Sequence, residues 1–117
     1  MNKFILIGLM ALSINAFASI KNTSAGKITK MYSYDDFGAV AGKEGSDVAV
    51  FFPTGLTECP QGVWLTPNAP GYKTLTSFLL TAFTTDLSVR FQVYTNRIWP
   101  DSSGNKLCQI DAIRFDK

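Results

Sequence analysis

Residues 58–90 carry the feature that most constrains the fold, a single helical pattern inside a chain that otherwise reads as strands. The segment opens with Cys59, continues through the strand fragment Val63-Trp64 and meets a turn rich in proline, asparagine and glycine at residues 67–71. One amphipathic helix follows, and a new strand starts at Val89. Because few small folds place one helix among strands in this way, the segment predicts a mainly β domain with one α-helix.

Strand patterns account for most of the rest of the chain. Apolar and polar residues alternate at residues 87–94, whereas residues 48–52 form a continuous β-branched and aromatic run, typical of a strand covered on both faces. Turn residues fill 35–47 and 96–105, and residues 19–26 read as a loose N-terminal arm. The order is β-β-β-α-β-β, which predicts an OB-fold-like five-stranded barrel with strands at 27–34, 48–52, 62–66, 87–94 and 107–115.

The helical pattern at residues 72–85 has a broader apolar side than one sheet contact requires. Asn68 is the expected N-cap, and Pro70 falls in the first turn, where its missing N–H costs nothing. Phe78 and Leu80 flank a main apolar side that consists of Tyr72, Leu75, Leu79, Ala82 and Phe83. The surplus indicates a second apolar contact, either a deep groove of the same domain or a neighbouring subunit. Phe78 and Leu80 are therefore candidate interface residues of a homo-oligomer.

The first 18 residues have the pattern of a secretory signal peptide. Lys3 gives a basic start, residues 4–12 are apolar, and Ala16-Phe17-Ala18 has the small-x-small pattern of a cleavage site. The alternative is a transmembrane anchor, but the apolar run is well short of the ~20 residues that span a bilayer. We therefore expect cleavage near Ala18, a secreted or periplasmic protein, no membrane insertion, and a single domain at residues 19–117.

Charge and composition argue against several classes of function. Without the signal peptide the chain has ten basic and nine acidic residues, and this balance gives no electrostatic reason to expect a nucleic-acid partner. The chain has no histidine, so we expect neither a zinc or copper site nor any other metal or cofactor. An enzyme is not expected because the usual nucleophile–base pairs are absent. Asp35 and Asp36 read as turn residues, and Asp111 as a hydrogen-bonded structural carboxylate.

Cys59 and Cys108 are the two cysteines of the chain. In an exported protein, two cysteines predict one disulfide. It would close a loop of about 50 residues and contribute roughly 4 kcal/mol in the chain-entropy model. That is a large share of the ~5–15 kcal/mol by which small domains are stable.

Several motifs together resemble one known family. They are Cys59, the Val63-Trp64 pair, the helix start Tyr72-Lys73-Thr74-Leu75, the threonine-rich helix end and the strand start Val89-Arg90-Phe91. Residues 24–29 also resemble the family's entry into its first strand, and Trp99 lies where the family has a loop tryptophan. In these features the chain resembles the B subunits of subtilase cytotoxin and of the typhoid-toxin type. The resemblance implies a secreted OB-fold homopentamer that binds cell-surface sialylated glycans and delivers an enzymatic A subunit.

The chain also departs from that family. The family's second strand carries a cysteine that pairs with the one matching Cys59, but residues 48–52 have none, so the partner here must be Cys108. The family's glycan pocket uses a serine that falls on Ser24. It also uses a tyrosine whose position is occupied by Val93, with Tyr94 beside it on the opposite face of the strand.

Two non-catalytic functions fit the sequence. The first is a glycan-binding module, which needs an aromatic platform and a few polar partners, with Ser24, Lys27, Tyr94 and Trp99 as candidates. Each has a plainer interpretation: Ser24 as an exposed arm residue, Trp99 as a cap of the barrel end and Tyr94 as a strand-end aromatic. The second function is a small exported OB-fold protein that binds another protein, as an inhibitor, an immunity-type protein or an envelope factor.

Overall fold

The computed structural model describes residues 19–100 and 104–116. The expected signal peptide at residues 1–18 lies outside this part of the chain. The described part is mainly β with one helix, as predicted, and that helix is not long and apolar enough to cross a membrane. Its elements are β1 (Ile20–Asn22), β2 (Lys30–Ser33), β3 (Val48–Phe51), β4 (Gly62–Leu65), α2 (Tyr72–Thr84), β5 (Val89–Ile98) and β6 (Leu107–Phe115).

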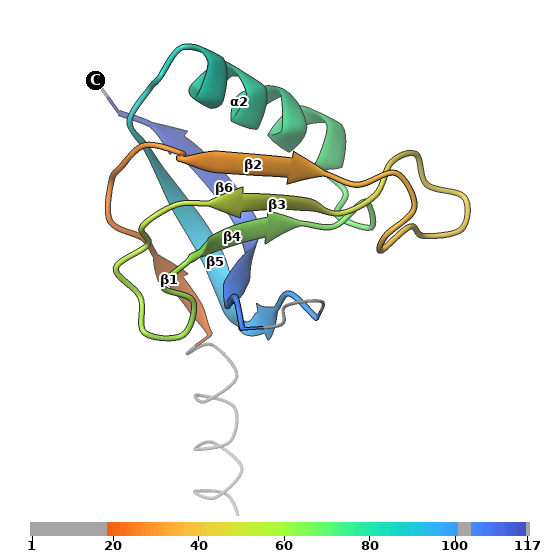
Figure 1. Cartoon of the computed structure of the whole chain (residues 1–117), viewed down its shortest axis with the longest axis horizontal. Coiled ribbons are helices and arrows are strands. Elements are labelled where there is room, and N and C mark those ends of the chain that lie inside the picture. Colours follow the sequence, from red (N-terminus) through yellow and green to blue (C-terminus); the bar gives the residue numbers. More distant parts are fainter. Residues whose placement is uncertain (1–18, 101–103, 117) are drawn as a thin grey trace, which may run out of the picture.

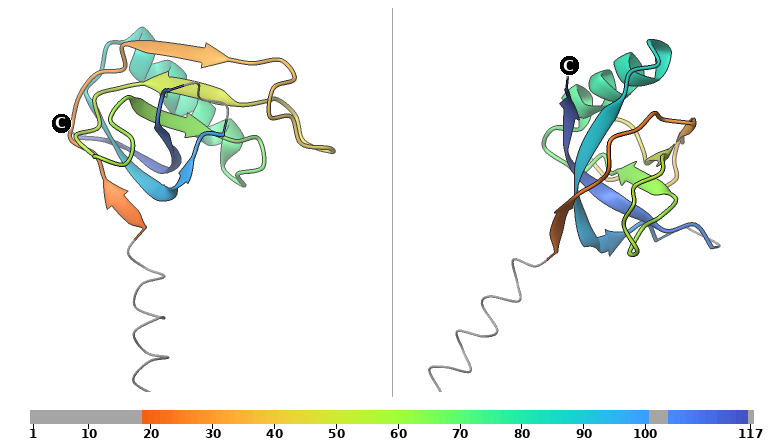
Figure 2. Two further views of the ribbon diagram at one scale, coloured as in Figure 1. Left: turned by 60° about the horizontal axis from the view of Figure 1, so that its bottom comes forward. Right: turned by 90° about the vertical axis from the view of Figure 1, so that its left-hand side faces the viewer.

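The strands of the described residues form one six-stranded sheet in the order β1-β5-β6-β4-β3-β2. The predicted five-stranded barrel is therefore wrong: the sheet is open and mixed, with a parallel β4–β6 pair and antiparallel pairs elsewhere. β2, β3 and β4 run across the direction of β5 and β6, and α2 lies to one side of the sheet (Figures 1 and 2).

The additional strand is β1, which lies in the segment predicted to be a loose arm. Ile20 pairs with Tyr94 and Asn22 pairs with Gln92, so this segment is an edge strand. Its three residues are all exposed. Because neither face of β1 is covered, its sequence carries no alternation of apolar and polar residues that would reveal a strand.

The chain between β1 and β2 is hydrogen-bonded on both sides. Thr23 N–H donates to Phe91 O at 2.8 Å, and Gly26 and Val89 exchange two backbone hydrogen bonds. On the other side, Thr29 N–H donates to Phe51 O at 2.9 Å. The connection thus pairs first with β5 and then with β3. The strand predicted at residues 27–34 is consequently shorter and spans only Lys30–Ser33.

Two hydrophobic clusters hold the sheet. The larger one packs the inner sides of β3, β4, β5 and β6 against Leu79 and Ala82 of α2, with the Phe52 and Phe91 rings edge to face at 5.0 Å. The smaller one lies on the other side of β3 and β4 and contains Ala49, Trp64, Trp99 and Leu107. Clusters on both sides explain why residues 48–52 read as a strand covered on both faces.

The helix begins at Tyr72, where its periodic pattern starts, so Pro70 precedes it and does not lie in its first turn. Its N-cap is Gly71, with no side-chain cap, and not Asn68, whose N–H instead donates to the Thr66 hydroxyl at 3.2 Å. On the exposed side of α2 the hydroxyls bond back to carbonyls four residues earlier. Examples are Ser77 to Lys73 O at 3.1 Å and Thr81 to Ser77 O at 2.9 Å.

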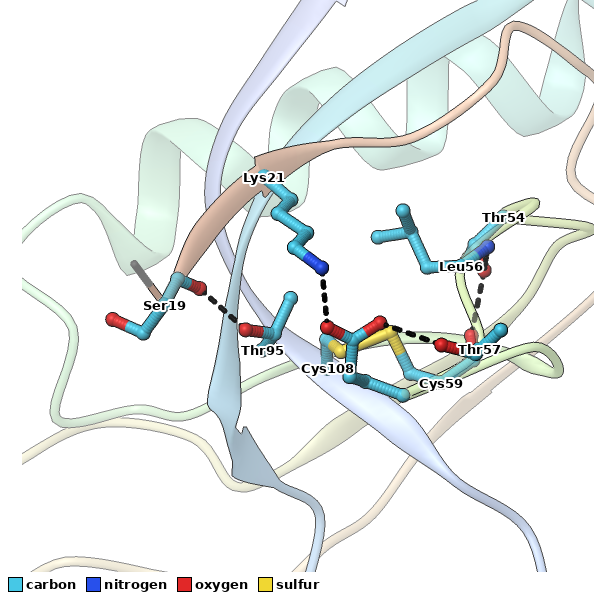
Figure 3. A network of polar contacts seen from close by, with 9 residues as sticks. Ser19, Lys21, Thr54, Leu56, Thr57, Cys59, Thr95 and Cys108 are labelled. Atoms are coloured by element: carbon cyan, nitrogen blue, oxygen red, sulfur yellow. Dashed lines mark hydrogen bonds and ion pairs between the residues drawn. A yellow bond between two sulfur atoms is a disulfide. The ribbon is translucent and has the colours of Figure 1, made fainter. Parts of the chain in front are cut away.

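The predicted disulfide between Cys59 and Cys108 is present (Figure 3). It ties the loop after β3 to the start of β6, and both cysteines are fully buried. The buried Thr54 hydroxyl donates to Cys59 O at 2.7 Å. Nearby, the Lys21 ammonium lies 2.7 Å from the Glu58 carboxylate, and this hydrogen bond lowers the pKa of Glu58. The loop is thus joined both to β6 and to β1.

Candidate functional site

A groove with a volume of about 790 Å³ lies between the start of α2 and the β5–β6 pair. Its helix side includes Thr66, Asn68 and Thr74, and its strand side includes Tyr94, Arg97 and Asp111. Ala69, Pro70, Leu75 and Ile110 add apolar surface. A concave site of this size with a few polar groups is typical of a small-ligand site.

Two irregularities of the β5–β6 pairing shape the strand side of this groove. Gln92 pairs with Ala112 and the next residue, Val93, pairs with Ile110, so Asp111 is an extra residue in β6. Such a bulge redirects the side chain that it contains. Further along, Tyr94 pairs with Gln109 but Ile98 pairs with Cys108, so residues 95–97 of β5 have no partners in β6. This second irregularity is where Arg97 enters the groove.

Asp111 orders the neighbouring side chains. The Tyr94 hydroxyl donates to Asp111 Oδ1 at 2.7 Å, and Gln92 Nε2–H donates to Asp111 Oδ2 at 3.0 Å. The hydrogen bond to Asp111 and, to a lesser extent, desolvation raise the pKa of Tyr94. Asp111 is therefore a hydrogen-bonded carboxylate, as the sequence suggested, and it fixes the phenol in its protonated form.

Arg97 lies against Tyr94. Its guanidinium carbon is 4.1 Å from the centroid of the Tyr94 ring, a cation–π geometry. Within the described residues Arg97 makes no ion pair. The guanidinium therefore keeps hydrogen-bond donors for a ligand, and its flat surface extends that of the phenol.

Of the four candidate glycan-binding residues, only Tyr94 lines this groove. Lys27 lies near the opposite end of α2, where its ammonium is 2.8 Å from the carboxylate of Asp86. Ser24 is exposed, and its N–H donates to Thr54 O at 2.8 Å. The structure therefore does not bring Ser24 and Lys27 together with Tyr94.

Trp99 is only 5% exposed and belongs to the smaller hydrophobic cluster. Its indole Nε1–H donates to Asp47 Oδ2 at 2.9 Å. Because the ring is covered, this conformation offers no face on which a sugar could stack. Val93, at the position of the family's pocket tyrosine, is fully buried in the larger cluster. A side chain at that position faces the protein interior, away from any ligand.

Sequence reasoning missed Arg97 as part of the groove. Residues 96–105 were predicted to be a loop, but β5 continues to Ile98. The signal that could have revealed Arg97 is weak, since alternation of apolar and polar residues stops after Tyr94. Tyr94 followed three residues later by an arginine is the only hint.

The candidate interface residues lie on opposite flanks of α2. Phe78 is 40% exposed and stacks on Phe115 at a centroid distance of 5.1 Å. Leu80 is 51% exposed and borders a small hollow of about 190 Å³ shared with Met31 and Ser33 at β2. Both therefore leave substantial apolar surface uncovered, and their role in an interface stays a prediction.

Comparison with known proteins gives no match to a family model, a curated protein or a solved structure. The resemblance to toxin B subunits therefore depends on the sequence motifs alone.

Proposed function

We propose that this chain is a secreted, non-catalytic binding module that takes a saccharide in the groove beside Tyr94 and Arg97. The observation that carries the proposal is the groove itself, about 790 Å³ in volume, with Tyr94, Arg97 and Asp111 on one wall. Saccharides combine apolar C–H faces with many hydroxyl groups. Such a ligand suits a flat aromatic–guanidinium surface next to several hydrogen-bonding side chains.

The polar groups of the groove can both donate hydrogen bonds to saccharide hydroxyls and accept hydrogen bonds from them. Arg97 offers donors, while the Tyr94 oxygen can accept because its own proton is committed to Asp111. On the opposite wall, the Thr66 hydroxyl accepts a hydrogen bond from the backbone N–H of Asn68. The side-chain amide of Asn68, which also lines the groove, is a separate group that can bond to a ligand. Tyr94 and Asp111 are held by strands and by hydrogen bonds, so they are in place before the ligand arrives.

The resemblance to toxin B subunits extends the proposal. In that interpretation the ligand is a cell-surface glycan, the protein is a homopentamer and an enzymatic A subunit is its partner. The strand order, with α2 between β4 and β5, supports an OB-fold-like architecture that has six strands instead of five. The buried Val93 argues that the glycan would use the Tyr94 groove and not the family's own pocket.

A glycan array with the secreted protein tests this function, and Arg97→Gln tests the site. We expect binding to at least one saccharide class and about a tenfold or larger loss of affinity in Arg97→Gln, since a charge-assisted hydrogen bond is removed. Lys27→Gln is the matched control, because Lys27 is an exposed cation at the other end of α2. Absence of any saccharide signal contradicts the function, and a loss in Lys27→Gln alone contradicts the site.

The uncovered apolar surface on α2 favours one alternative, a protein that binds another protein. Phe78, Leu80 and Phe83 are each at least 40% exposed. In a homopentamer, neighbouring copies would cover these side chains, whereas an inhibitor or envelope factor would present them to a different protein. A monomeric mass in native solution, together with a silent glycan array, would favour this alternative.

A further inference from the structure

All three arginines of the chain lie on β5 and β6, whereas three of the lysines form ion pairs elsewhere in the fold. Lys21, Lys27 and Lys73 each form an ion pair with a carboxylate. Within the described residues, no arginine does. We call the outer surface that carries Arg90, Arg97 and Arg114 the arginine face.

Arg90 and Arg114 lie directly opposite each other in the antiparallel β5–β6 pair. The bulge at Asp111 creates this arrangement, because the extra residue shifts the alternation of β6 by one position. Ile113 consequently packs against the core, and Arg114 comes to the outer side beside Arg90. Like charges directly opposite each other destabilise a strand pair. Among the described residues, no carboxylate forms an ion pair with either of these two cations.

A small cavity of about 120 Å³ lies at this pair. Asn22, Gln92 and Ala112 line it together with the two arginines. Arg90 Nε is buried and has no hydrogen-bond partner, the one side-chain atom of this kind among the described residues. A buried donor without a partner is costly, so an acceptor that enters the cavity would remove that cost.

We propose that Arg90 and Arg114 form an anion-binding site for a carboxylate, sulfate or phosphate group. Two guanidinium groups on adjacent strands match the several oxygens of such an anion better than any neutral ligand. Asp111, the acidic residue of β6, does not supply this anion: it bonds to Tyr94 and Gln92 and forms no ion pair with either arginine. The site uses residues outside the groove of Tyr94, so it stands whether or not that groove binds a saccharide.

The anion can be free in solution or can belong to an acidic saccharide. The cavity and the groove are neighbours, because Gln92 lines the cavity and donates a hydrogen bond to Asp111, which lines the groove. A saccharide that fills the groove could therefore place an acidic substituent between Arg90 and Arg114.

Nuclear magnetic resonance of the ¹⁵N-labelled protein tests the site, because it reports the Arg90 Nε–H directly. Sodium sulfate replaces sodium chloride at constant ionic strength, and a sulfated disaccharide is titrated in parallel. We expect saturable shifts of the Arg90 Nε–H signal and of the backbone amides at Arg90 and Arg114. Arg114→Gln should weaken sulfate binding about tenfold or more, since it removes one of the two charged donors.

Lys43→Gln is the matched control, because Lys43 is an exposed cation in the loop between β2 and β3. It should bind sulfate as the unchanged protein does. Tighter binding of the disaccharide, with shifts at Tyr94, assigns the anion to a saccharide, whereas equal affinity for both probes assigns it to a free anion. Shifts that stay linear with concentration, or that are the same in Arg114→Gln, would overturn the proposal.

Discussion

The arginine face and the flanks of α2 are two exposed surfaces with opposite chemistry. The first presents guanidinium groups, the hydrogen-bonded amide of Gln92 and the Tyr94–Asp111 pair on two paired strands. The second presents Phe78 and Leu80, half exposed and on opposite sides of one helix. The polar surface is ordered by hydrogen bonds within the chain, whereas the apolar surface lacks the contacts that would cover it.

The two surfaces differ in how firmly their side chains are already held. On the arginine face, hydrogen bonds fix Gln92, Tyr94 and Asp111, so these three side chains lose little conformational freedom when a ligand binds. The helix flanks instead gain from any contact that removes apolar area from water. Two apolar flanks on opposite sides of a helix are also what a head-to-tail ring requires, because each copy must offer two different surfaces. We therefore propose ligand binding for the arginine face and assembly for the flanks of α2.

The largest expected effect comes from removing the disulfide, which supports both surfaces. Its 49-residue separation in sequence predicts that Cys59→Ser with Cys108→Ser lowers the free energy of unfolding. The expected loss is about 4 kcal/mol in the chain-entropy model. Urea denaturation followed by circular dichroism and by tryptophan fluorescence measures it.

Circular dichroism reports the secondary structure as a whole, whereas both tryptophans lie in the smaller hydrophobic cluster. Coincident transitions would show that this cluster unfolds together with the sheet and α2. A loss well below 1 kcal/mol would contradict the assigned role of the disulfide.

A smaller effect is expected from Leu80→Glu on the apolar surface. A charge placed in a buried subunit contact should weaken assembly by roughly 2 kcal/mol or more, a factor of about thirty or larger. Native mass spectrometry or light scattering measures the shift toward the monomer mass. Thr81→Glu is the matched control because it adds the same charge on the exposed polar side of α2.

Saccharide binding to a single groove should not change in Leu80→Glu, because Leu80 does not line the groove. If the unchanged protein is already a monomer, the homo-oligomer proposal fails and binding of another protein becomes the favoured interpretation of the flanks.

The sequence predicted the parts of the fold that bury a face. α2, β3, β4 and β6 were found within one or two residues, because their apolar residues repeat with the period of the element. The disulfide was predicted from the presence of two cysteines in a chain expected to be exported. β1 was missed because all three of its residues are exposed, and the N-cap was misplaced because Gly71 caps α2 without a side-chain bond.

The candidate functional surfaces could be predicted only in part. Tyr94 became a candidate because it lies beside Val93, the position of the family's pocket tyrosine, on the opposite face of the strand. Ser24, Lys27 and Trp99 do not join it, because long-range pairing decides which segments of the chain meet. Arg114 could not be assigned to the arginine face. Strict alternation along β6 would place the Arg114 side chain on the same side as Ile110, facing the core. The bulge at Asp111 moves it to the outer side.

The smallest effect is a pH dependence confined to the arginine face. The hydrogen bond to Asp111 raises the pKa of Tyr94 above its ordinary value of 10.0. A raised pKa in the folded state means that this stabilisation is complete below about pH 10 and is lost as the pH rises through the folded-state pKa. Asp111→Asn should therefore lower the pKa of Tyr94, measured from tyrosinate absorbance as the difference between each protein and its Tyr94→Phe counterpart.

Leu80→Glu should leave this pKa unchanged, and Tyr32→Phe controls for the loss of an exposed tyrosine elsewhere. If Leu80→Glu shifts the pKa of Tyr94 as much as Asp111→Asn does, the two surfaces are coupled, and the separation between ligand binding and assembly does not hold.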